Sequence, residues 1–377
     1  MLPKVALRRC GTYETSEVYN TVKESVGLLG GIGSFVKKGE KILIKPNLLS
    51  AKSPDAAITT HPSFVKAVIR LVKEAGAYPV VGDSPGMGST AKVAARCGIL
   101  DVCKEEDIPL VEFRQSIEID NPDGKTFKRF EIAKEVLDVD GIINLPKLKT
   151  HTQMFMTLGV KNMFGCIVGT RKAQWHLSAG SDREHFARML VDLYLFLKPR
   201  LTIVDGIIGL EGEGPGSSGK PRHLGLVLAS QDAIALDRVV MEIIGAKPDN
   251  LYTCKVARDD GLGETDIKRI DVLGDSIQSV FVRDFVFPKI VDIAFSLPYN
   301  LNRHLKKHLT AKPYINKKIC TLCKMCVDLC PPHIMKKIDN AIEIDYDNCI
   351  RCFCCQEICP EGAIRVKEGW LMKVLLK

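Results

Sequence analysis

Short apolar runs alternate along the chain with longer segments in which apolar residues recur every three or four positions. The short runs predict strands at 5–7, 41–47, 78–84, 110–113, 140–145, 201–206 and 224–230. Helical spacing is found at 63–76, 183–198 and 233–245, and Gly76 is a plausible C-cap of the first helix. This alternation predicts an α/β domain with a mostly parallel sheet and flanking helices.

Polar segments follow several of these predicted strands, where ligands bind in parallel sheets. They include KPN (45–47), GDSPG (82–86), LPKLKTH (145–151) and TLGVKNMFGC (157–166). Lysines at such positions predict a site for an organic anion, a carboxylate or a phosphate. The predicted binding residues are Lys45, Asn47, Asp83, Lys147, Lys149, Lys161, Asn162 and Asp205, and the nearby Lys172 and His176 extend the set. The alternative is a basic surface loop.

Two residues of these segments are candidates for chemistry. His151 is a candidate acid–base group, because the reference pKa of histidine lies near neutrality. Cys166 is a candidate thiol, with a buried core cysteine as the equal alternative.

The cysteines form the most specific pattern in the sequence. Nine of the 14 cysteines lie between Cys320 and Cys359. Eight of them form two C-x2-C-x2-C-x3-C-P runs, and each ligand of the second run follows its counterpart after 29 residues. The fourth cysteine of such a run ligates the other cluster. The spacing predicts one 4Fe-4S cluster on Cys320, Cys323, Cys326 and Cys359, and a second on Cys349, Cys352, Cys355 and Cys330.

Zinc is the alternative occupant, but four-cysteine zinc sites usually use two C-x2-C pairs with a longer loop between them. Cys354 lies between two ligands and is predicted to be a spare thiol that points away from the cluster. The repeat predicts a small α+β ferredoxin-like module with two similar halves.

These features divide the chain into an α/β domain (1–278), a linker that packs on it (279–312), a ferredoxin domain (313–367) and a tail (368–377). An interfacial helix is the alternative for 279–309, although Pro288 and Pro298 interrupt it. The stretch at 209–219 is predicted to be a mobile loop that carries Glu211 and Glu213, or a plain connector.

Two nucleotide-binding patterns fail. GPGSSGKP (214–221) has proline where a P-loop needs serine or threonine, and a strand is predicted after it instead of a helix. GLLGGIG (27–33) does not open a helix after a strand, so it is no dinucleotide-binding fingerprint.

Composition is that of an ordinary soluble protein, with 46% hydrophobic and 26% charged residues. The net charge of +8 comes with no nucleic-acid-binding motif, so no nucleic-acid partner is expected. Neither a membrane span nor a secretory signal is evident, which predicts a cytoplasmic protein whose membrane contact, if any, is peripheral.

The motifs also carry a family resemblance. The KPN, THP (60–62), GDSPG, LPKLKTH, TL-x-x-KN-x-x-GC and Asp205–Gly206 segments resemble a conserved domain of unknown function that often precedes a two-cluster ferredoxin. The resemblance covers nearly the whole chain. It implies an iron–sulfur protein typical of anaerobic bacteria and archaea, and it supplies no reaction.

The leading hypothesis is a ferredoxin-linked oxidoreductase, in which two 4Fe-4S clusters pass electrons from a redox protein partner to an organic anion in the α/β domain. Two alternatives stay open. One is a non-catalytic electron-transfer subunit or docking adaptor, and the other is a factor that helps to assemble a cofactor elsewhere.

Overall fold

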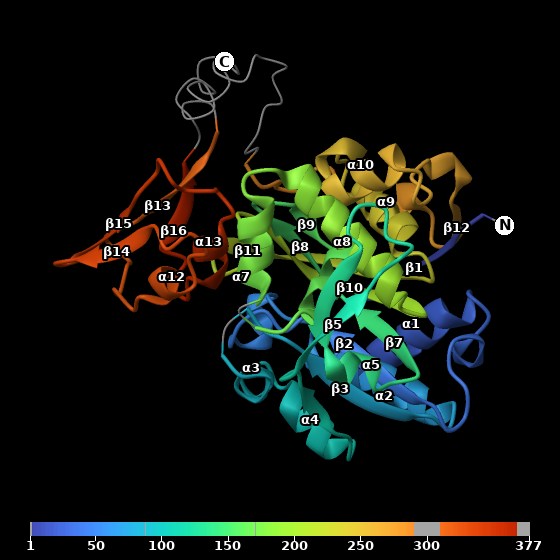
Figure 1. Ribbon diagram of the computed structural model, residues 1–377. Helices are drawn as coiled ribbons and strands as arrows, with labels where there is room; N and C mark the ends of the chain where they lie inside the picture. Colours follow the sequence, from blue (N-terminus) through green and yellow to red (C-terminus); the bar gives the residue numbers. More distant parts are fainter. Residues whose placement is uncertain (1, 87, 170, 290–309, 368–377) are drawn as a thin grey trace.

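The computed structural model describes residues 2–86, 88–169, 171–289 and 310–367, and Figure 1 shows two parts lying side by side. The α/β body (described residues up to 289) holds a ten-stranded sheet, and the ferredoxin module (310–367) packs against one side of it. The last predicted segment, 368–377, lies outside the described residues, as do residues 290–309 of the predicted linker.

The main sheet has the order β12-β1-β11-β10-β7-β2-β3-β4, and β8 and β9 continue from β10. All pairs are parallel except those that involve β11 or β9. The mostly parallel sheet predicted from the sequence is therefore confirmed. Its strands are β1 (Lys4–Arg9), β2 (Lys41–Pro46), β3 (Tyr78–Asp83), β4 (Leu110–Glu112), β7 (Gly141–Leu145), β8 (Lys147–His151), β9 (Phe155–Thr157), β10 (Leu201–Gly212), β11 (Gly219–Ser230) and β12 (Asp271–Gly274).

Helices cover both faces of this sheet. One face packs against α1 (Thr15–Gly27), α2 (Pro62–Glu74), α3 (Thr90–Arg96) and α4 (Ile99–Glu105). The other packs against α5 (Lys134–Leu137), α6 (Gly159–Asn162), α8 (Arg183–Leu197), α9 (Ala233–Ile243) and α10 (Tyr252–Asp259). A separate hairpin, β5 (Ser116–Asp120) with β6 (Arg129–Ala133), and α7 (Arg171–Ala179) complete the body.

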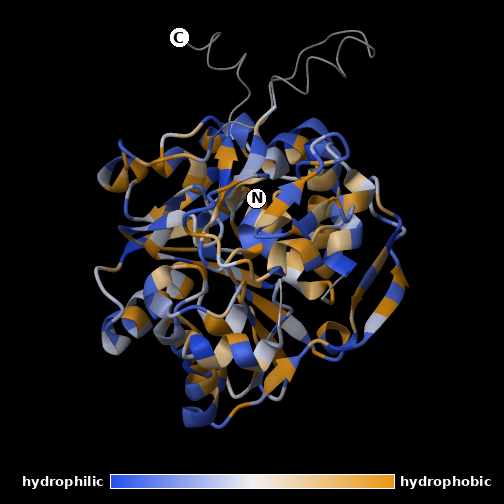
Figure 2. Ribbon diagram, turned by 90° about the vertical axis from the view of Figure 1, so that its left-hand side faces the viewer, coloured by the Kyte–Doolittle hydropathy of each residue, from blue (hydrophilic) through white to orange (hydrophobic). Residues whose placement is uncertain are grey.

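Alternation along the strands explains why both faces are covered. In β2, Ile42 and Ile44 enter the core on one face, whereas Leu43 enters the core on the other. Successive side chains of a strand point to opposite faces, so an uninterrupted apolar run needs a helix layer on each side. Figure 2 shows the result as apolar central strands with polar residues along the outer helices.

Two segments differ from their predicted form. Part of 209–219 is strand and not loop, because β10 extends to Gly212 and pairs with β11 from Gly219 onward, which leaves 213–218 as the turn between them. The antiparallel partner satisfies the backbone of both strands, which a local sequence pattern does not reveal. Likewise, LPKLKTH does not form a strand-end loop. Lys147–His151 is the buried strand β8, and it pairs with β10 and β9.

The ferredoxin module has two similar halves, as the cysteine repeat predicted. Its outer hairpin is β14 (Met335–Ile338) with β15 (Ala341–Ile344), and its other sheet pairs β13 (Lys312–Ile315) with β16 (Ile364–Lys367). Two short helices, α12 (Met325–Asp328) and α13 (Cys354–Ile358), follow the two cysteine loops. In Figure 1, α13 lies on the side of the body, and β14 and β15 project away from it.

The turn between β10 and β11 contacts the module. Gln356 Nε2 donates to the carbonyl of Glu213 at 2.9 Å, and Ser218 Oγ donates to the carbonyl of Ile364 at 3.1 Å. Glycines permit this close approach, since a Cβ on Gly216 would lie 2.5 Å from the carbonyl oxygen of Glu357. The described start of the predicted linker also packs on the body, where Val280 and Phe285 are buried.

Candidate functional site

Eight cysteines of the ferredoxin module surround two cavities. Cys320, Cys323, Cys326 and Cys359 line the first cysteine cavity, and Cys330, Cys349, Cys352 and Cys355 line the second. Their empty volumes are similar, about 360 and 320 Å³. These are the two groups predicted from the repeat, with the fourth cysteine of each run in the opposite group. Sets of four thiol ligands around a cavity fit 4Fe-4S clusters.

Cys354 does not line either cysteine cavity. It is buried, and it lines a larger pocket between the module and the α/β body. Its thiol also lies beside that of Cys352, a predicted ligand, so its orientation away from the cluster stays a prediction.

The interdomain pocket has an empty volume of about 780 Å³ and a wall from each part of the protein. The body contributes polar residues from the ends of β2, β3 and β9, from the middle of β8, and from α6 and α7. The module contributes Cys354, Glu357 and Ile358 of α13, and Leu329. The polar residues lining the pocket are Asn47, Asp83, Ser84, Lys149, Thr157, Lys161, Asn162, Lys172, His176 and Glu357, with apolar walls at Leu48, Leu49, Phe164 and Ile358.

Three lysines face this pocket. Lys149 is 1% exposed, and its ammonium donates to Asn47 Oδ1 at 2.6 Å and to the carbonyl of Ile58 at 2.7 Å. Lys172 is only partly buried as a residue, and its ammonium donates to the carbonyls of Ser84 and Pro85. Lys161 is 9% exposed, and the described residues offer its ammonium no hydrogen-bond acceptor, only the ring of Phe164 at 5.6 Å.

Burial makes these ammonium groups costly. It lowers the pKa of Lys149 to about 7 and the pKa of Lys172 to about 8, and it also lowers the pKa of Lys161. The carboxylate of Glu357, in the module, raises the pKa of all three lysines and so opposes the effect of burial. A buried ammonium without a counter-charge is unfavourable, so an anion in the pocket would stabilise the charged form of each lysine.

Two further polar atoms at the pocket have no partner among the described residues. They are Thr157 Oγ1 and His176 Nδ1, both fully buried. Burial lowers the pKa of His176 to about 3, so its ring is neutral at physiological pH. Native proteins rarely leave buried polar atoms unpaired, and a ligand or ordered water in the pocket would satisfy them.

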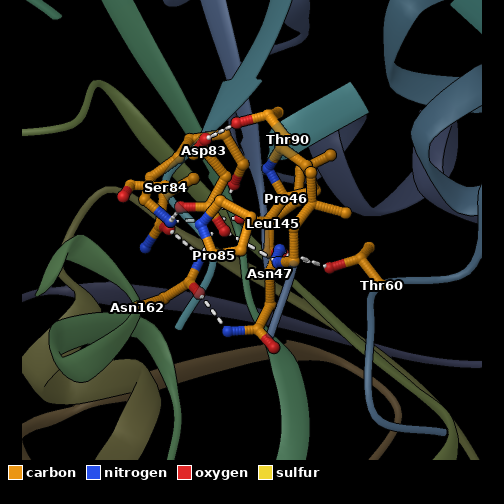
Figure 3. Close-up of polar contacts among 12 residues, drawn as sticks. Pro46, Asn47, Thr60, Asp83, Ser84, Pro85, Thr90, Leu145 and Asn162 are labelled. Atoms are coloured by element: carbon orange, nitrogen blue, oxygen red, sulfur yellow. Dashed lines mark hydrogen bonds and ion pairs between the residues drawn. The ribbon is translucent and has the colours of Figure 1, made fainter. Parts of the chain in front are cut away.

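The end of β2 and helix α6 place the two amides of the pocket, Asn47 and Asn162. Figure 3 shows Asn47 Nδ2 donating to Asn162 Oδ1 at 2.9 Å, while the Asn47 backbone N–H donates to Thr60 Oγ1 at 2.8 Å. Beneath them, Lys45 and Asp83 form a buried ion pair at 2.9 Å. Gly165 lies directly against this pair, since a Cβ there would be 2.0 Å from Asp83 Oδ1.

Three predicted binding residues do not line the pocket, namely Lys45 beneath it and two others that lie elsewhere. Lys147 and Asp205 form a buried ion pair at 2.9 Å and do not line the pocket. Tyr13 completes the group: its hydroxyl donates to Asp205 Oδ1 at 2.6 Å and accepts from the Lys147 ammonium at 2.6 Å. His61 stacks on Tyr13, and its backbone N–H donates to Asp205. With these partners the charges of the pair are satisfied internally.

Neither candidate for chemistry lines the pocket. His151 is 2% exposed, and burial together with the nearby lysines keeps its pKa well below the ordinary value, so the premise of a near-neutral pKa does not hold. Its Nδ1 accepts from the backbone N–H groups of Gln153 and Met154, and its Nε2 lies 3.7 Å from Glu357. Cys166 is fully buried in the apolar core, and burial raises the pKa of its thiol to about 12. Both environments disfavour the predicted chemical roles.

The alternative of a basic surface loop is wrong for the residues of β2, β8 and α6, because Lys45, Lys147, Lys149 and Lys161 are all buried. Sequence reasoning missed Glu357 and Cys354 as parts of the pocket wall. Both lie inside the second cysteine run, where the ligand spacing accounts for the whole motif, so no local signal distinguishes them.

Comparison with known families agrees with this architecture. Residues 42–242 match the family described as a domain of unknown function, DUF362, and residues 312–360 match a 4Fe-4S dicluster domain. The chain belongs to the DUF362 family. It carries a ferredoxin-type module that binds 4Fe-4S clusters, and it is an iron–sulfur electron-transfer protein.

Relatives match different parts of this DUF362 protein. The thylakoid-associated protein sll1697 of Synechocystis is 40% identical over 307 residues, which is 81% of this chain and 94% of the relative. Pyruvate synthase subunit PorD of Methanothermobacter marburgensis is 41% identical over 59 residues, 16% of this chain and 69% of that subunit. The lactate racemase apoprotein of Thermoanaerobacterium thermosaccharolyticum gives a TM-score of 0.40 at 14% identity, over 62% of this chain and 55% of that structure.

Among the described residues, no helix has the length and apolar character that crossing a membrane requires. The name of the Synechocystis relative refers to thylakoids, so the predicted cytoplasmic location stays a prediction.

Proposed function

We propose that this protein is an oxidoreductase in which two 4Fe-4S clusters exchange electrons with an organic anion bound in the interdomain pocket. The observation that carries the proposal is the shared wall of that pocket. Cys354 and Glu357 line it from the cluster-binding module, and Lys149 and Lys161 line it from the α/β body. A bound molecule would therefore contact both the buried lysines and the helix that supplies Cys355, a predicted cluster ligand.

The charges indicate an anion. Lys149, Lys161 and Lys172 face the pocket, and Glu357 is the carboxylate that acts on all three. Asp83, which is paired with Lys45, also acts on Lys149 and Lys172. Leu48, Leu49 and Phe164 would pack against an apolar part of the same molecule. Binding sites for small molecules commonly combine such apolar walls with a few placed polar groups.

A 4Fe-4S cluster supplies one electron at a time. Held by the eight cysteines, two such clusters would together supply two electrons, which with two protons would balance a two-electron reduction of the bound anion, and oxidation would need the reverse. The chain's own residues would orient the anion, and Lys149, with its pKa lowered to about 7, would hold or release a proton near neutrality. A redox protein partner would supply or remove the electrons.

A second candidate function is a non-catalytic electron-transfer subunit. The observation in its favour is that the module resembles pyruvate synthase subunit PorD over 59 residues. In that case the α/β body would recognise a protein partner, and the interdomain pocket would hold no substrate.

The test uses protein purified without oxygen. Native mass spectrometry weighs any co-purified ligand. Protein reduced with dithionite is then mixed with a panel of carboxylates and organic phosphates, and cluster reoxidation is followed by absorbance. We expect at least one anion to accelerate reoxidation, and we expect Lys161→Met to weaken its apparent affinity by about tenfold to a hundredfold, the value of a charged hydrogen bond.

Lys104→Met is the matched control, because the Lys104 side chain is 69% exposed on α4 and does not line the pocket. It should behave as the wild type. Intact clusters without co-purified ligand, and without acceleration by any anion of the panel, would contradict the enzyme and favour the electron-transfer subunit.

A further inference from the structure

The two halves of the ferredoxin module differ in exposure, although their cysteine spacing is identical. Cys323 is exposed, whereas Cys352, its counterpart 29 residues later, is 8% exposed. The next residues differ in the same way: Lys324 is exposed and Phe353 is 2% exposed. The first cysteine loop therefore faces solvent, and the second is enclosed.

Packing inside the module and against the body together explain this difference. Phe353 is buried within the module beside Ala311 and Val366, and α13 contacts the turn between β10 and β11 of the body through Gln356. The same helix lines the interdomain pocket. The second half is thus the inner one, and the first half is the one that an outside protein could reach.

Charge distinguishes the halves as well. Lys317, Lys318 and Lys324, here called the lysine patch, are all exposed around the first cysteine loop. Within the described chain, none of them forms an ion pair with a carboxylate. The corresponding positions of the second half are Tyr346, Asp347 and Phe353. Lys324 lines the first cysteine cavity together with the exposed Cys323, so the positive charge lies beside a cluster-binding thiol.

We propose that the lysine patch is the docking surface for an acidic redox protein, which exchanges single electrons with the chain through the first cysteine cavity. One electron leaves the reduced partner and enters this chain, or passes in the opposite direction, with no bond formed. The inner second cavity then connects the docking surface to the side of the interdomain pocket. The docking surface itself does not rest on the proposed enzyme function and would serve an electron-transfer subunit equally.

Physical reasons favour a redox protein over an anionic membrane as the occupant. Electron-transfer encounters are small and transient, and they depend on complementary charge that steers association. An exposed cluster ligand at the centre of the contact shortens the path for an electron, whereas membrane binding has no use for it. Two acids, Asp328 and Glu361, are also exposed nearby and would orient the partner rather than abolish the attraction.

The test compares two charge-reversal variants of the full-length, cluster-loaded chain. Lys318→Glu/Lys324→Glu alters the lysine patch. Lys336→Glu/Lys337→Glu makes the same change in charge on the projecting β14–β15 hairpin, where both lysines are exposed. Reduction by an acidic ferredoxin is measured by stopped flow at low and high salt. Zero-length carbodiimide cross-linking to the same ferredoxin, followed by peptide mapping, gives a readout that needs no electron transfer.

We expect the patch variant to lower the second-order rate constant by about tenfold or more at low salt, the loss shrinking as salt screens the charges. Cross-links should map to Lys317, Lys318 or Lys324, and dithionite should still reduce both variants, which shows that the clusters are intact. Equal effects of the two variants, or cross-links confined to other lysines, would overturn the proposal.

Sedimentation with anionic vesicles tests the remaining possibility, that the lysine patch binds a membrane. If the wild type binds vesicles through the lysine patch and does not cross-link to the ferredoxin, the surface binds membranes and the proposal is wrong. A lysine patch that functions while Lys161→Met has no effect would leave docking intact and reject the enzyme alone.

Discussion

The buried lysines fall into two groups whose surroundings differ sharply. Lys45 and Lys147 each form an ion pair with a buried aspartate, at 2.9 Å in both cases. Lys149 and Lys161 are nearly as buried, yet no carboxylate lies within ion-pair distance of either among the described residues, and both face the interdomain pocket. Burial alone therefore does not separate the paired lysines from those that face the pocket. The location of the counter-charge separates them.

The difference has an energetic meaning. An ion pair that is buried and fully hydrogen-bonded resists the loss of either member, because the other is left as an uncompensated charge. A buried lysine without a counter-ion already carries that cost. Replacing such a lysine should leave the fold intact. It should weaken only the binding of the anion that would have supplied the counter-charge.

The largest effect should come from Lys147→Met. This change leaves Asp205 buried beside Tyr13 without its cation, and we expect the free energy of unfolding to fall by about 3–5 kcal/mol. Urea unfolding under anaerobic conditions, followed by far-UV circular dichroism, measures the loss. In the double variant Lys147→Met/Asp205→Asn most of it should be recovered, since the amide oxygen still accepts from the His61 backbone. An additive loss in the double variant would show that the pair is not the source.

The pH dependence of anion binding in the pocket should be an effect of intermediate size. Lys149 and Lys172 titrate near 7 and 8 because of burial, below the usual lysine pKa of about 10.4. An anion binds the protonated forms, so its affinity should fall by up to about tenfold per pH unit for each proton above these values. The stability of the ligand-free protein should change in the opposite direction. Between the lowered pKa values and the usual lysine pKa, the unfolded chain binds more protons than the folded one, so the free energy of unfolding rises with pH.

Calorimetric titration of the anion found by the reoxidation screen, from about pH 6 to about pH 9, brackets both pKa values. Lys149→Met should remove part of the slope. A flat profile in the wild type would mean that these ammonium groups do not contact the ligand.

The smallest effect on stability should come from Lys161→Met. The ammonium has no hydrogen-bond acceptor among the described residues, and methionine has a similar length and an apolar end. We expect the free energy of unfolding to stay the same or to rise by about 1 kcal/mol in the ligand-free protein. The same urea titration measures it. A loss as large as that of Lys147→Met would erase the distinction between the two groups of lysines.

Local patterns in the sequence determined much of this protein. The cysteine repeat assigned all eight ligands to two groups, because the spacing and the trailing prolines are short-range features. Apolar runs located the seven predicted strands, and the mostly parallel sheet followed from their alternation with helices. Of the residues predicted to bind an anion, five line one pocket: Asn47, Asp83, Lys149, Lys161 and Asn162. Their role in binding stays a prediction.

Only the tertiary structure decided which lysines are paired and which face the interdomain pocket. Asp205 lies 58 residues from Lys147, and Glu357 lies about 200 residues from the lysines it opposes, so neither relation leaves a local trace. The enclosure of the second cysteine loop likewise depends on long-range contacts, of Phe353 with Ala311 and Val366 and of α13 with the β10–β11 turn. The spacing of residues in the sequence determines which segments form strands, helices and cysteine loops. Contacts between distant segments determine how deeply each side chain is buried and which charges surround it, and these decide its chemical role.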